Sequence, residues 1–212
     1  MSCLFALCAA GGYIAGSIPF GLVLCYMAGY GDIRKIGSGN IGATNVLRTG
    51  NKLLALLTVF LDAFKAGLAA LVAVKFMPQT PVNFLGTETT MNVVGALVAG
   101  SMGVIGHNFP VWLRFKGGKG VASAFGFILM TQWPLSLIAL AVWLIVAFTF
   151  RYSSLAALTA AVSMPFAAFF LCPLIYAVFY TVIALLVIVR HHANIHRLLA
   201  GNESKISFKK KS

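Results

Sequence analysis

Glycines and hydrogen-bonding side chains are concentrated between residues 32 and 48, and their types suit recognition of a phosphate group. Glycines in this segment permit sharp turns and a close approach of the backbone to a ligand. Arg48 adds a planar charged fork that suits phosphate. The other polar candidates are Ser38, Asn40, Thr44 and Asn45. We interpret the segment as a binding loop, with a solvated, turn-rich linker as the alternative.

A second glycine-rich turn lies within residues 106–123, directly before a predicted helix. Gly117, Gly118 and Gly120 surround Lys119. Backbone N–H groups at the amino end of a helix bind anions, and the helix dipole favours negative charge there. The turn is not a Walker A loop, because Lys119 is followed by Gly120 rather than Ser or Thr. It predicts a phosphate cradle, although a flexible basic turn beside anionic lipid would look similar.

A third polar segment, residues 190–203, follows the last apolar stretch. If that stretch continues as helix, Arg190, Asn194 and Arg197 share one face, with His191 beside Asn194 at i, i+3. Gly201 is a natural helix stop. The histidines of this segment fit an interfacial basic helix better than a metal site, and we expect no metal.

The remainder of the chain is apolar enough to require a lipid environment. Hydrophobic residues make up 60% of the 212 residues and charged residues only 9%, whereas a soluble domain carries roughly 25% charged residues. The bilayer must therefore solvate most of the chain. The four cysteines lack CxxC spacing and are interpreted as packing residues. We expect one membrane-embedded domain, residues 1–212.

The apolar stretches predict seven transmembrane helices. They run over 3–30, 53–75, 91–106, 120–149 and 153–189. The last two are too long for single spans, because a helix rises 1.5 Å per residue and the hydrocarbon core is about 30 Å thick. Breaks at Trp133-Pro134 and Cys172-Pro173 divide them, which leaves 120–131 as a short or partial span.

The distribution of lysine and arginine predicts the orientation. With seven helices, fourteen of the sixteen basic residues fall on one side, including the run Lys209–Lys211. The positive side is then cytoplasmic, the N-terminus outside and the C-terminus inside. The same rule explains the net charge of +12 without a nucleic-acid partner. The outer connections, 76–90, 131–135 and 171–174, are expected to be turns.

One ionisable pair lies inside a predicted span. Asp62 and Lys65 are three residues apart, which predicts an intramembrane ion pair. An intramembrane charge is also a candidate functional site, so both interpretations stay open.

Three polar motifs follow one another along the chain: GSGNIGATNVLR at 37–48, GHNFPVWLRFKGGKGVAS at 106–123 and RHHANIHRLLAGNE at 190–203. They resemble the three cytoplasmic motifs of the bacterial membrane glycerol-3-phosphate acyltransferases that use acyl phosphate as donor. The segments GSIPFG at 16–21 and LDAFKAG at 61–67 are also similar to that family. The resemblance therefore covers nearly the whole chain.

The resemblance implies a seven-helix enzyme of the bacterial inner membrane, with its site at the cytoplasmic face. It would transfer a fatty acyl group from acyl phosphate to the 1-hydroxyl of glycerol 3-phosphate, giving lysophosphatidic acid and inorganic phosphate. It implies neither an organic cofactor nor an obligate protein partner. His196 departs from the asparagine of another member, so no catalytic role is assigned to it.

The resemblance alone implies the roles of Ser154 and Glu203, and for the other site residues it adds to what their types suggest. We assign catalytic roles to Ser38, Arg48, Lys119, His191 and Asn194. Substrate-binding roles go to Asn40, Thr44, Asn45, His107, Gly117, Gly118, Gly120 and Ser154. Structural roles go to Asp62, Lys65 and Glu203.

The proton acceptor is left open by the sequence. Acids are few, and an HxxxxD motif is absent, because Trp112 follows His107 and His196 follows His191 at the fifth position. Either substrate phosphate accepts the proton or His191 acts as base. An anion transporter and a scaffold that binds anionic lipid are the rival functions.

Overall fold

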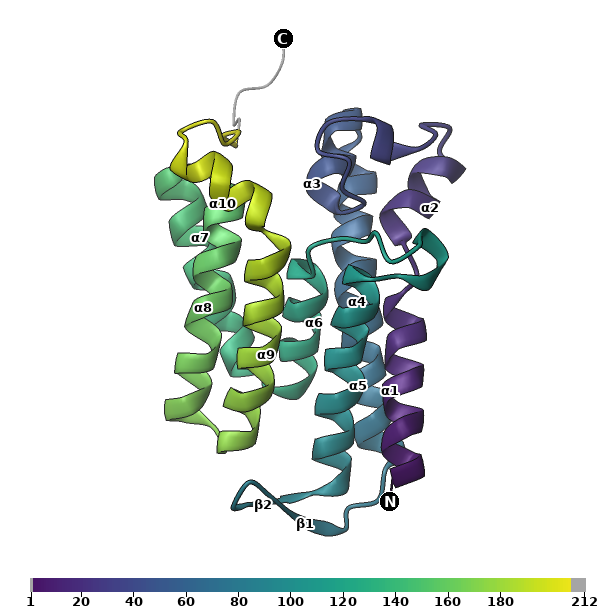
Figure 1. Ribbon diagram of the computed structural model, residues 1–212, viewed down its shortest axis with the longest axis vertical. Helices are drawn as coiled ribbons and strands as arrows, with labels where there is room; N and C mark the ends of the chain where they lie inside the picture. Colours follow the sequence, from purple (N-terminus) through teal and green to yellow (C-terminus); the bar gives the residue numbers. More distant parts are fainter. Residues whose placement is uncertain (1, 207–212) are drawn as a thin grey trace. The chain divides into compact units, whose positions relative to one another are not determined.

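The computed structural model describes residues 2–206, so the predicted lipid-binding run Lys209–Lys211 lies outside the described residues. These residues form two compact units, one that ends at Trp133 and one that begins at Pro134. Helices dominate both units (Figure 1). The prediction of an all-helical integral membrane protein is confirmed. Within the described chain, five helical stretches are long and apolar enough to cross a membrane, or six with one bent pair.

The first unit is built from long helices that lie side by side. Its main helices are α1 (Ser2–Gly16), α2 (Phe20–Met27), α4 (Lys52–Phe76), α5 (Met91–Asn108) and α6 (Val121–Thr131). The short elements of the polar loops are η1 (Ile33–Lys35), α3 (Ala43–Val46), η2 (Leu47–Thr49) and η3 (Val111–Leu113). Figure 1 shows α3 at the end of this unit away from the N-terminus.

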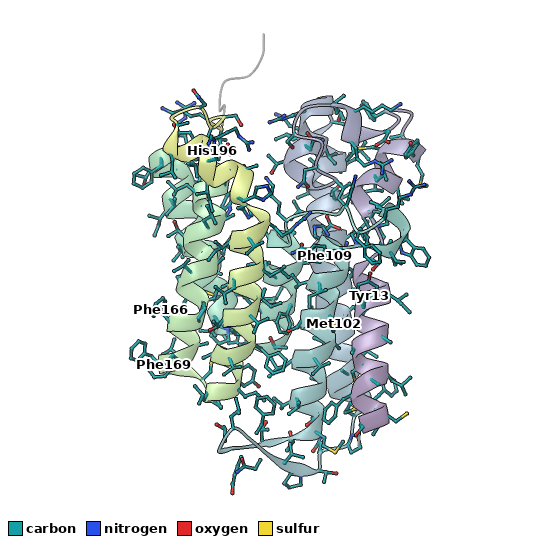
Figure 2. All side chains as sticks on the ribbon, viewed as in Figure 1. Tyr13, Met102, Phe109, Phe166, Phe169 and His196 are labelled. Carbon is teal, nitrogen blue, oxygen red and sulfur yellow. The ribbon has the colours of Figure 1, made fainter. Side chains whose placement is uncertain are left out.

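Close backbone contact joins α1 to α5. Gly12 and Gly16 face the carbonyl oxygens of Ala99 and Gly103, where a Cβ atom would overlap those carbonyls. Small residues allow the backbones of two helices to approach closely. Such close packing matters in a membrane, because the hydrophobic effect does not drive helices together there. At the end of this interface, the Tyr13 hydroxyl donates to the Phe109 carbonyl over 2.8 Å, and both residues are labelled in Figure 2.

The connection between α4 and α5, expected to be a turn, forms a β-hairpin instead. Strands β1 (Pro81–Phe84) and β2 (Thr87–Thr90) pair antiparallel, with Phe84 opposite Thr87. Leu85 and Gly86 form the two-residue loop, and both have positive φ angles, 51° and 77°. Such loops match the twist of paired strands, and valine and threonine favour strands. The signal in the sequence was the pair Leu85-Gly86, between one segment that contains valine and another that contains threonine.

The second unit contains α7 (Trp133–Phe150), α8 (Ser153–Leu171), α9 (Leu174–Arg190) and α10 (His192–Leu199). The boundary between the units falls after Trp133, the first residue of α7. The break predicted at Cys172-Pro173 is present, whereas the one predicted at Trp133-Pro134 lies one residue earlier, at Gln132, because Trp133 and Pro134 begin α7. Helices α9 and α10 form the bent pair, with an angle of 61° between them at His191. Figure 2 shows Phe166 and Phe169 pointing outward from α8, and their exposed fractions of 65% and 62% suit contact with lipid.

Candidate functional site

The segment between α2 and α4 is folded around one buried amide, that of Asn45. Its Nδ2 donates to the carbonyls of Ile33 (2.8 Å) and Ile36 (3.2 Å). Its Oδ1 accepts from the backbone N–H of Ser38 (3.1 Å) and lies 3.3 Å from the Ser38 hydroxyl. Apolar side chains, including Ile33 and Val46, anchor the segment in a buried cluster with α2 and α4. Asn45 thus orders the loop that presents Ser38.

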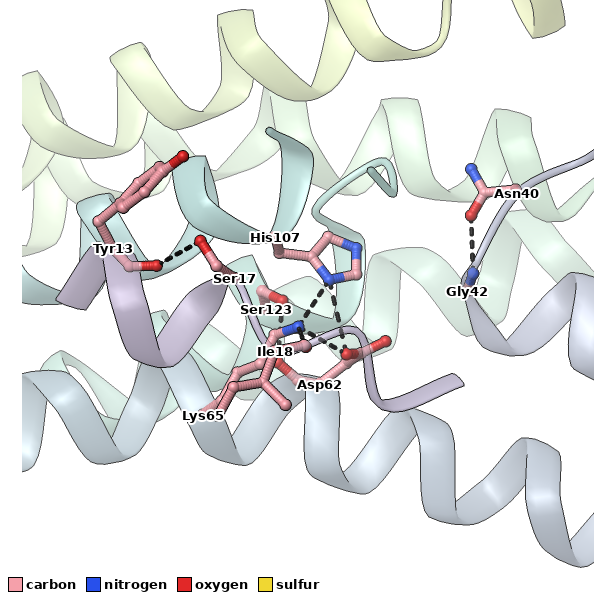
Figure 3. Close-up of polar contacts among 9 residues, drawn as sticks. All are labelled: Tyr13, Ser17, Ile18, Asn40, Gly42, Asp62, Lys65, His107 and Ser123. Carbon is pink, nitrogen blue, oxygen red and sulfur yellow. Dashed lines mark hydrogen bonds and ion pairs between the residues drawn. The ribbon is translucent and has the colours of Figure 1, made fainter. Parts of the chain in front are cut away.

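The other candidates of this segment lie towards its surface. Ser38, Thr44 and Arg48 are exposed. The Arg48 side chain packs against Gly37, where a Cβ atom would overlap its guanidinium. Asn40 is half-buried, and its Oδ1 accepts from the Gly42 N–H over 2.7 Å (Figure 3). The structure therefore gathers these predicted site residues on one folded loop.

In the glycine-rich turn before α6, two backbone N–H groups are occupied by hydrogen bonds within the protein. The N–H of Gly117 donates to the Asn108 carbonyl (3.2 Å) and that of Gly118 to the His107 carbonyl (3.0 Å). These two amides close the turn onto the end of α5 and are occupied by its carbonyls. Gly120 precedes α6 with φ at 82°, and in the part of the chain that the structure describes no side chain caps that helix.

A buried polar cluster adjoins this turn, because the His107 ring lies against Gly118. Figure 3 shows the side chains of the cluster. The expected ion pair is present, with Lys65 Nζ 2.8 Å from Asp62 Oδ1. Lys65 Nζ also donates to the Ile18 carbonyl over 2.7 Å and lies 3.0 Å from His107 Nδ1. Pro19 interrupts the helix between α1 and α2, so Lys65 satisfies a carbonyl at that break. The sequence showed the ion pair but not these two further partners.

One carboxylate organises the polar end of the second unit. Glu203 Oε1 accepts from the Ser154 hydroxyl and from Asn194 Nδ2, each over 2.7 Å. Its Oε2 accepts from Arg197 Nε over 2.6 Å. The segment after Gly201, which has φ at 71° and follows α10 as expected, is thereby fastened to α8 and α10.

Glu203 should make stability depend on pH. Desolvation raises its pKa, but hydrogen bonds from Ser154, Asn194 and Arg197 together hold it below the ordinary value. A lowered pKa adds stability above the unfolded value of about 4.3, and that stability is lost as pH falls through the folded pKa. At pH 7, Glu203→Gln should therefore lower the free energy of unfolding by about 1.5 kcal/mol.

The measurement is the thermal unfolding midpoint in detergent at several pH values from 7 to 3. The gap between wild type and Glu203→Gln should be widest near neutral pH, should narrow as pH falls below the unfolded pKa of about 4.3, and should close once pH is below the folded pKa. A gap that stays constant across this range would show that the carboxylate charge does not contribute.

His191 lies at the bend between α9 and α10 and is 2% exposed. Its Nδ1 lies 2.7 Å from the Val187 carbonyl. A carbonyl oxygen only accepts, so Nδ1 carries hydrogen, and in the neutral ring Nε2 is the nitrogen with the lone pair. This tautomer is the one required if His191 Nε2 is to accept a proton.

Each of the four acidic residues is engaged or remote from the polar loops. Asp32 binds Arg34 at 2.6 Å, and hydrogen bonding from that guanidinium lowers the pKa of Asp32 to about 2. Asp62 pairs with Lys65, and Glu203 is held as described. Glu88 is exposed on the hairpin, opposite Asn83. None of these carboxylates is placed as an available general base.

Sequence reasoning overlooked one buried group. Asn108, at the end of α5, is fully buried, and within residues 2–206 neither its Oδ1 nor its Nδ2 has a hydrogen-bond partner. The amide lies against Gly120, where a Cβ atom would contact Oδ1. No feature of the sequence distinguished Asn108 from an ordinary polar loop residue.

The sequence is similar to known glycerol-3-phosphate acyltransferases over nearly its whole length. The family model "Glycerol-3-phosphate acyltransferase" matches residues 6–201. The glycerol-3-phosphate acyltransferase of Rhodospirillum rubrum is 53% identical over 209 residues, which cover 99% of this chain and 94% of that protein. That of Mesorhizobium japonicum is 54% identical over 198 residues, covering 93% of this chain and 94% of its own.

The fold is also similar to that of solved structures. One is the crystal structure of PlsY (YgiH), an integral membrane glycerol 3-phosphate acyltransferase, in its glycerol 3-phosphate form. The TM-score is 0.85 with 36% sequence identity, over 96% of both chains. The lysophosphatidic acid form gives a TM-score of 0.83 with 35% identity, over 96% of this chain and 95% of the other. The chain belongs to the glycerol-3-phosphate acyltransferase family.

Proposed function

We propose that the acyl donor of this acyltransferase is acyl phosphate, and that the products are 1-acyl-glycerol 3-phosphate (lysophosphatidic acid) and inorganic phosphate. The similarity to PlsY, whose solved structures are a glycerol 3-phosphate form and a lysophosphatidic acid form, supports the acceptor and the acylated product. The donor is supported by the resemblance of the three polar motifs to acyltransferases that use acyl phosphate. Three phosphate-suited polar segments are consistent with phosphorylated substrates. The reaction needs no added cofactor, because the acyl phosphate is already activated.

Substrate roles are proposed for residues of both units. In the first unit, the Arg48 guanidinium binds phosphate oxygens, with Ser38, Asn40 and Thr44 as hydrogen-bonding groups and Asn45 as the amide that orders them. Lys119 supplies charge at the turn formed by Gly117, Gly118 and Gly120. In the second unit, His191, Asn194 and Ser154 contact substrate, and Glu203 orients the last two.

The chemistry proposed is a direct acyl transfer. The 1-hydroxyl oxygen attacks the carbonyl carbon, the carbon–oxygen bond to phosphate breaks, and the hydroxyl proton passes to a phosphate oxygen of the substrate. Positioning then supplies much of the catalysis, since alignment of reactants contributes roughly 7–11 kcal/mol. The engagement of Asp32, Asp62 and Glu203 supports this mechanism over one with a carboxylate base.

Replacing His191 by glutamine separates substrate assistance from a histidine base. With substrate phosphate as proton acceptor, kcat should stay within about tenfold of wild type, whereas loss of a general base costs about 10²–10⁴ in rate. The measurement is the maximal rate of lysophosphatidic acid formation at saturating substrates. The exposed neighbour His192, replaced by glutamine, is the matched control. A fall in kcat of about 10³ specific to His191 would establish the histidine base.

We also propose that the chain acts as one domain of seven transmembrane helices, with the N-terminus outside and the active site at the cytoplasmic face of the bacterial inner membrane. The distribution of basic residues supports this orientation. Single cysteines introduced at Lys116 and at Glu88, in a variant lacking the four native cysteines, would test it. In intact cells, an impermeant thiol reagent should label position 88 but not position 116.

The decisive experiment for the donor uses purified protein in detergent. Glycerol 3-phosphate is supplied with palmitoyl phosphate or with palmitoyl-CoA, and both lysophosphatidic acid and inorganic phosphate are followed. Turnover with the acyl phosphate alone, with equal amounts of both products, is expected. Turnover with palmitoyl-CoA alone would overturn the proposed donor, and so would the absence of turnover with palmitoyl phosphate by folded protein.

A further inference from the structure

The buried cluster of the first unit has its full complement of hydrogen bonds around Lys65. An ammonium group has three donors and no acceptor. Lys65 Nζ has three acceptors in reach: the Ile18 carbonyl at 2.7 Å, Asp62 Oδ1 at 2.8 Å and His107 Nδ1 at 3.0 Å (Figure 3). The side chains of Lys65 and Asp62 are only 3% and 4% exposed. The charge on Lys65 is therefore balanced by Asp62 and fully hydrogen-bonded.

His107 lies within reach of both charges of the pair. Its Nδ1 is 3.0 Å from Lys65 Nζ and 3.5 Å from Asp62 Oδ1. The Nε2 edge of the ring lies directly against Gly118, where the nearest atoms to an added Cβ all belong to His107. The backbone of His107 also accepts from the Gly118 N–H over 3.0 Å. His107 thus connects the buried cluster with Gly118, in the middle of the turn.

The far side of the turn is tied to the same cluster. Ser123, in the first turn of α6, is fully buried and donates its hydroxyl to the backbone carbonyl of Asp62 over 2.8 Å. The turn formed by residues 117–120 is therefore attached at both ends. His107 holds it on the side of α5, and Ser123 holds it on the side of α6. Both attachments lead to a single stretch of α4, residues 62–65.

The burial of this charged cluster costs desolvation free energy that apolar side chains of the same volume would not cost. Charged groups inside a membrane are costly, and apolar residues of similar volume often replace a buried ion pair without loss of stability. The contact of this charged pair with His107, whose ring lies against Gly118, points to a role in the geometry of the turn. The side chains themselves are shielded from substrate, because both are buried within the helices.

We infer that Asp62, Lys65, His107 and Ser123 form an intramembrane positioning unit, which holds the 117–120 turn in the geometry that binds a phosphoryl group. This inference rests on the proposed function of the turn. The four residues are positioning residues, because they act through the backbone of Gly118 and through the start of α6. Their loss should weaken phosphate binding while the chemical step is largely retained.

The first test replaces the ion pair by a neutral pair, Asp62→Asn with Lys65→Met, so that no unpaired charge is left buried. Two constants are measured: the KM of each substrate, and the inhibition constant of inorganic phosphate, which is a product. The inhibition constant and at least one KM should rise about tenfold, with kcat within about threefold of wild type. Unchanged constants in a folded double variant would overturn the inference, as would a loss confined to kcat.

The second test removes one hydroxyl and uses a matched control. Ser123→Ala deletes the bond between α6 and α4, whereas Ser17→Ala deletes a bond of similar length, 2.7 Å, from Ser17 to the Tyr13 carbonyl of its own helix. Both serines are fully buried. Ser123→Ala should raise the phosphate inhibition constant and Ser17→Ala should not. Equal behaviour of the two variants would contradict the inference.

The third test uses the contact between His107 and Gly118. Gly118→Ala alone places a methyl group against the ring and should weaken phosphate binding. His107→Asn keeps an acceptor for Lys65 but removes the ring atoms that face Gly118, so the methyl fits in the double variant. Phosphate binding by the double variant should exceed that of Gly118→Ala. If the two effects simply multiply, His107 does not act through the turn.

These outcomes are distinguishable from failure of the proposed function. If the proposed function fails, wild-type protein does not turn over palmitoyl phosphate. If wild-type protein turns over palmitoyl phosphate and is inhibited by inorganic phosphate, unchanged constants in the variants overturn the positioning unit alone.

Discussion

Arg48→Lys is expected to lower kcat/KM by about 10- to 100-fold, because hydrogen bonds to a charged group contribute roughly 1.5–3 kcal/mol. Lysine keeps the charge but loses the planar fork that can bind two phosphate oxygens at once. The position of Arg48 against Gly37 sets the direction of that fork on the ordered loop. The measurement is kcat/KM for each substrate, with palmitoyl phosphate as donor.

The control for this substitution comes from the same segment. Arg34 is also exposed and charged, but its guanidinium is engaged by Asp32 at 2.6 Å. Arg34→Lys should therefore change kcat/KM by less than about twofold, since a surface ion pair contributes little. Equal losses in the two variants would mean that the loop responds to any change of arginine, and Arg48 would lose its assigned role as a phosphate ligand.

Asp62→Asn alone is expected to lower the free energy of unfolding by about 3–5 kcal/mol, the cost of leaving one partner of a buried ion pair uncompensated. The reason is specific to the cluster: Lys65 is 3% exposed at its side chain and would remain as a charge without a carboxylate. The measurement is thermal unfolding in detergent at pH 7, followed by loss of helix signal.

The neutral pair of Asp62→Asn with Lys65→Met is the control for that loss. It should recover most of the stability, because no unpaired charge remains in the apolar interior. If the single variant is as stable as the pair, the charge on Lys65 is being neutralised in some other way. If the pair is as unstable as the single variant, packing rather than charge dominates at this position.

Local features of the sequence predicted local features of the structure. Prolines at 134 and 173 placed two helix breaks to within one residue, glycine at 201 placed the end of α10, and an i, i+3 spacing placed the Asp62–Lys65 pair. Each of these depends on residues a few positions apart. The spacing rules of a single helix or turn are sufficient to recognise them.

Features that depend on tertiary packing could not be predicted in this way. Lys65 reaches Ile18, 47 positions away, and His107, 42 positions away. Glu203 meets Ser154 across 49 positions. The occupation of two glycine amides of the 117–120 turn could not be predicted for the same reason, since the carbonyls that accept from them belong to the end of α5. Motifs indicated which residues matter, but not which of them hold the others in place.

The loop of the β-hairpin offers a practical route to a more robust protein. Leu85 adopts a left-handed backbone conformation while its side chain is 66% exposed, so it is unfavourable in both respects. Asparagine before glycine is the preferred pair for such two-residue loops. Leu85→Asn should raise the free energy of unfolding by roughly 1 kcal/mol, the penalty that leucine incurs in this conformation. Longer survival in detergent would make purification and crystallisation easier without touching the residues that meet substrate.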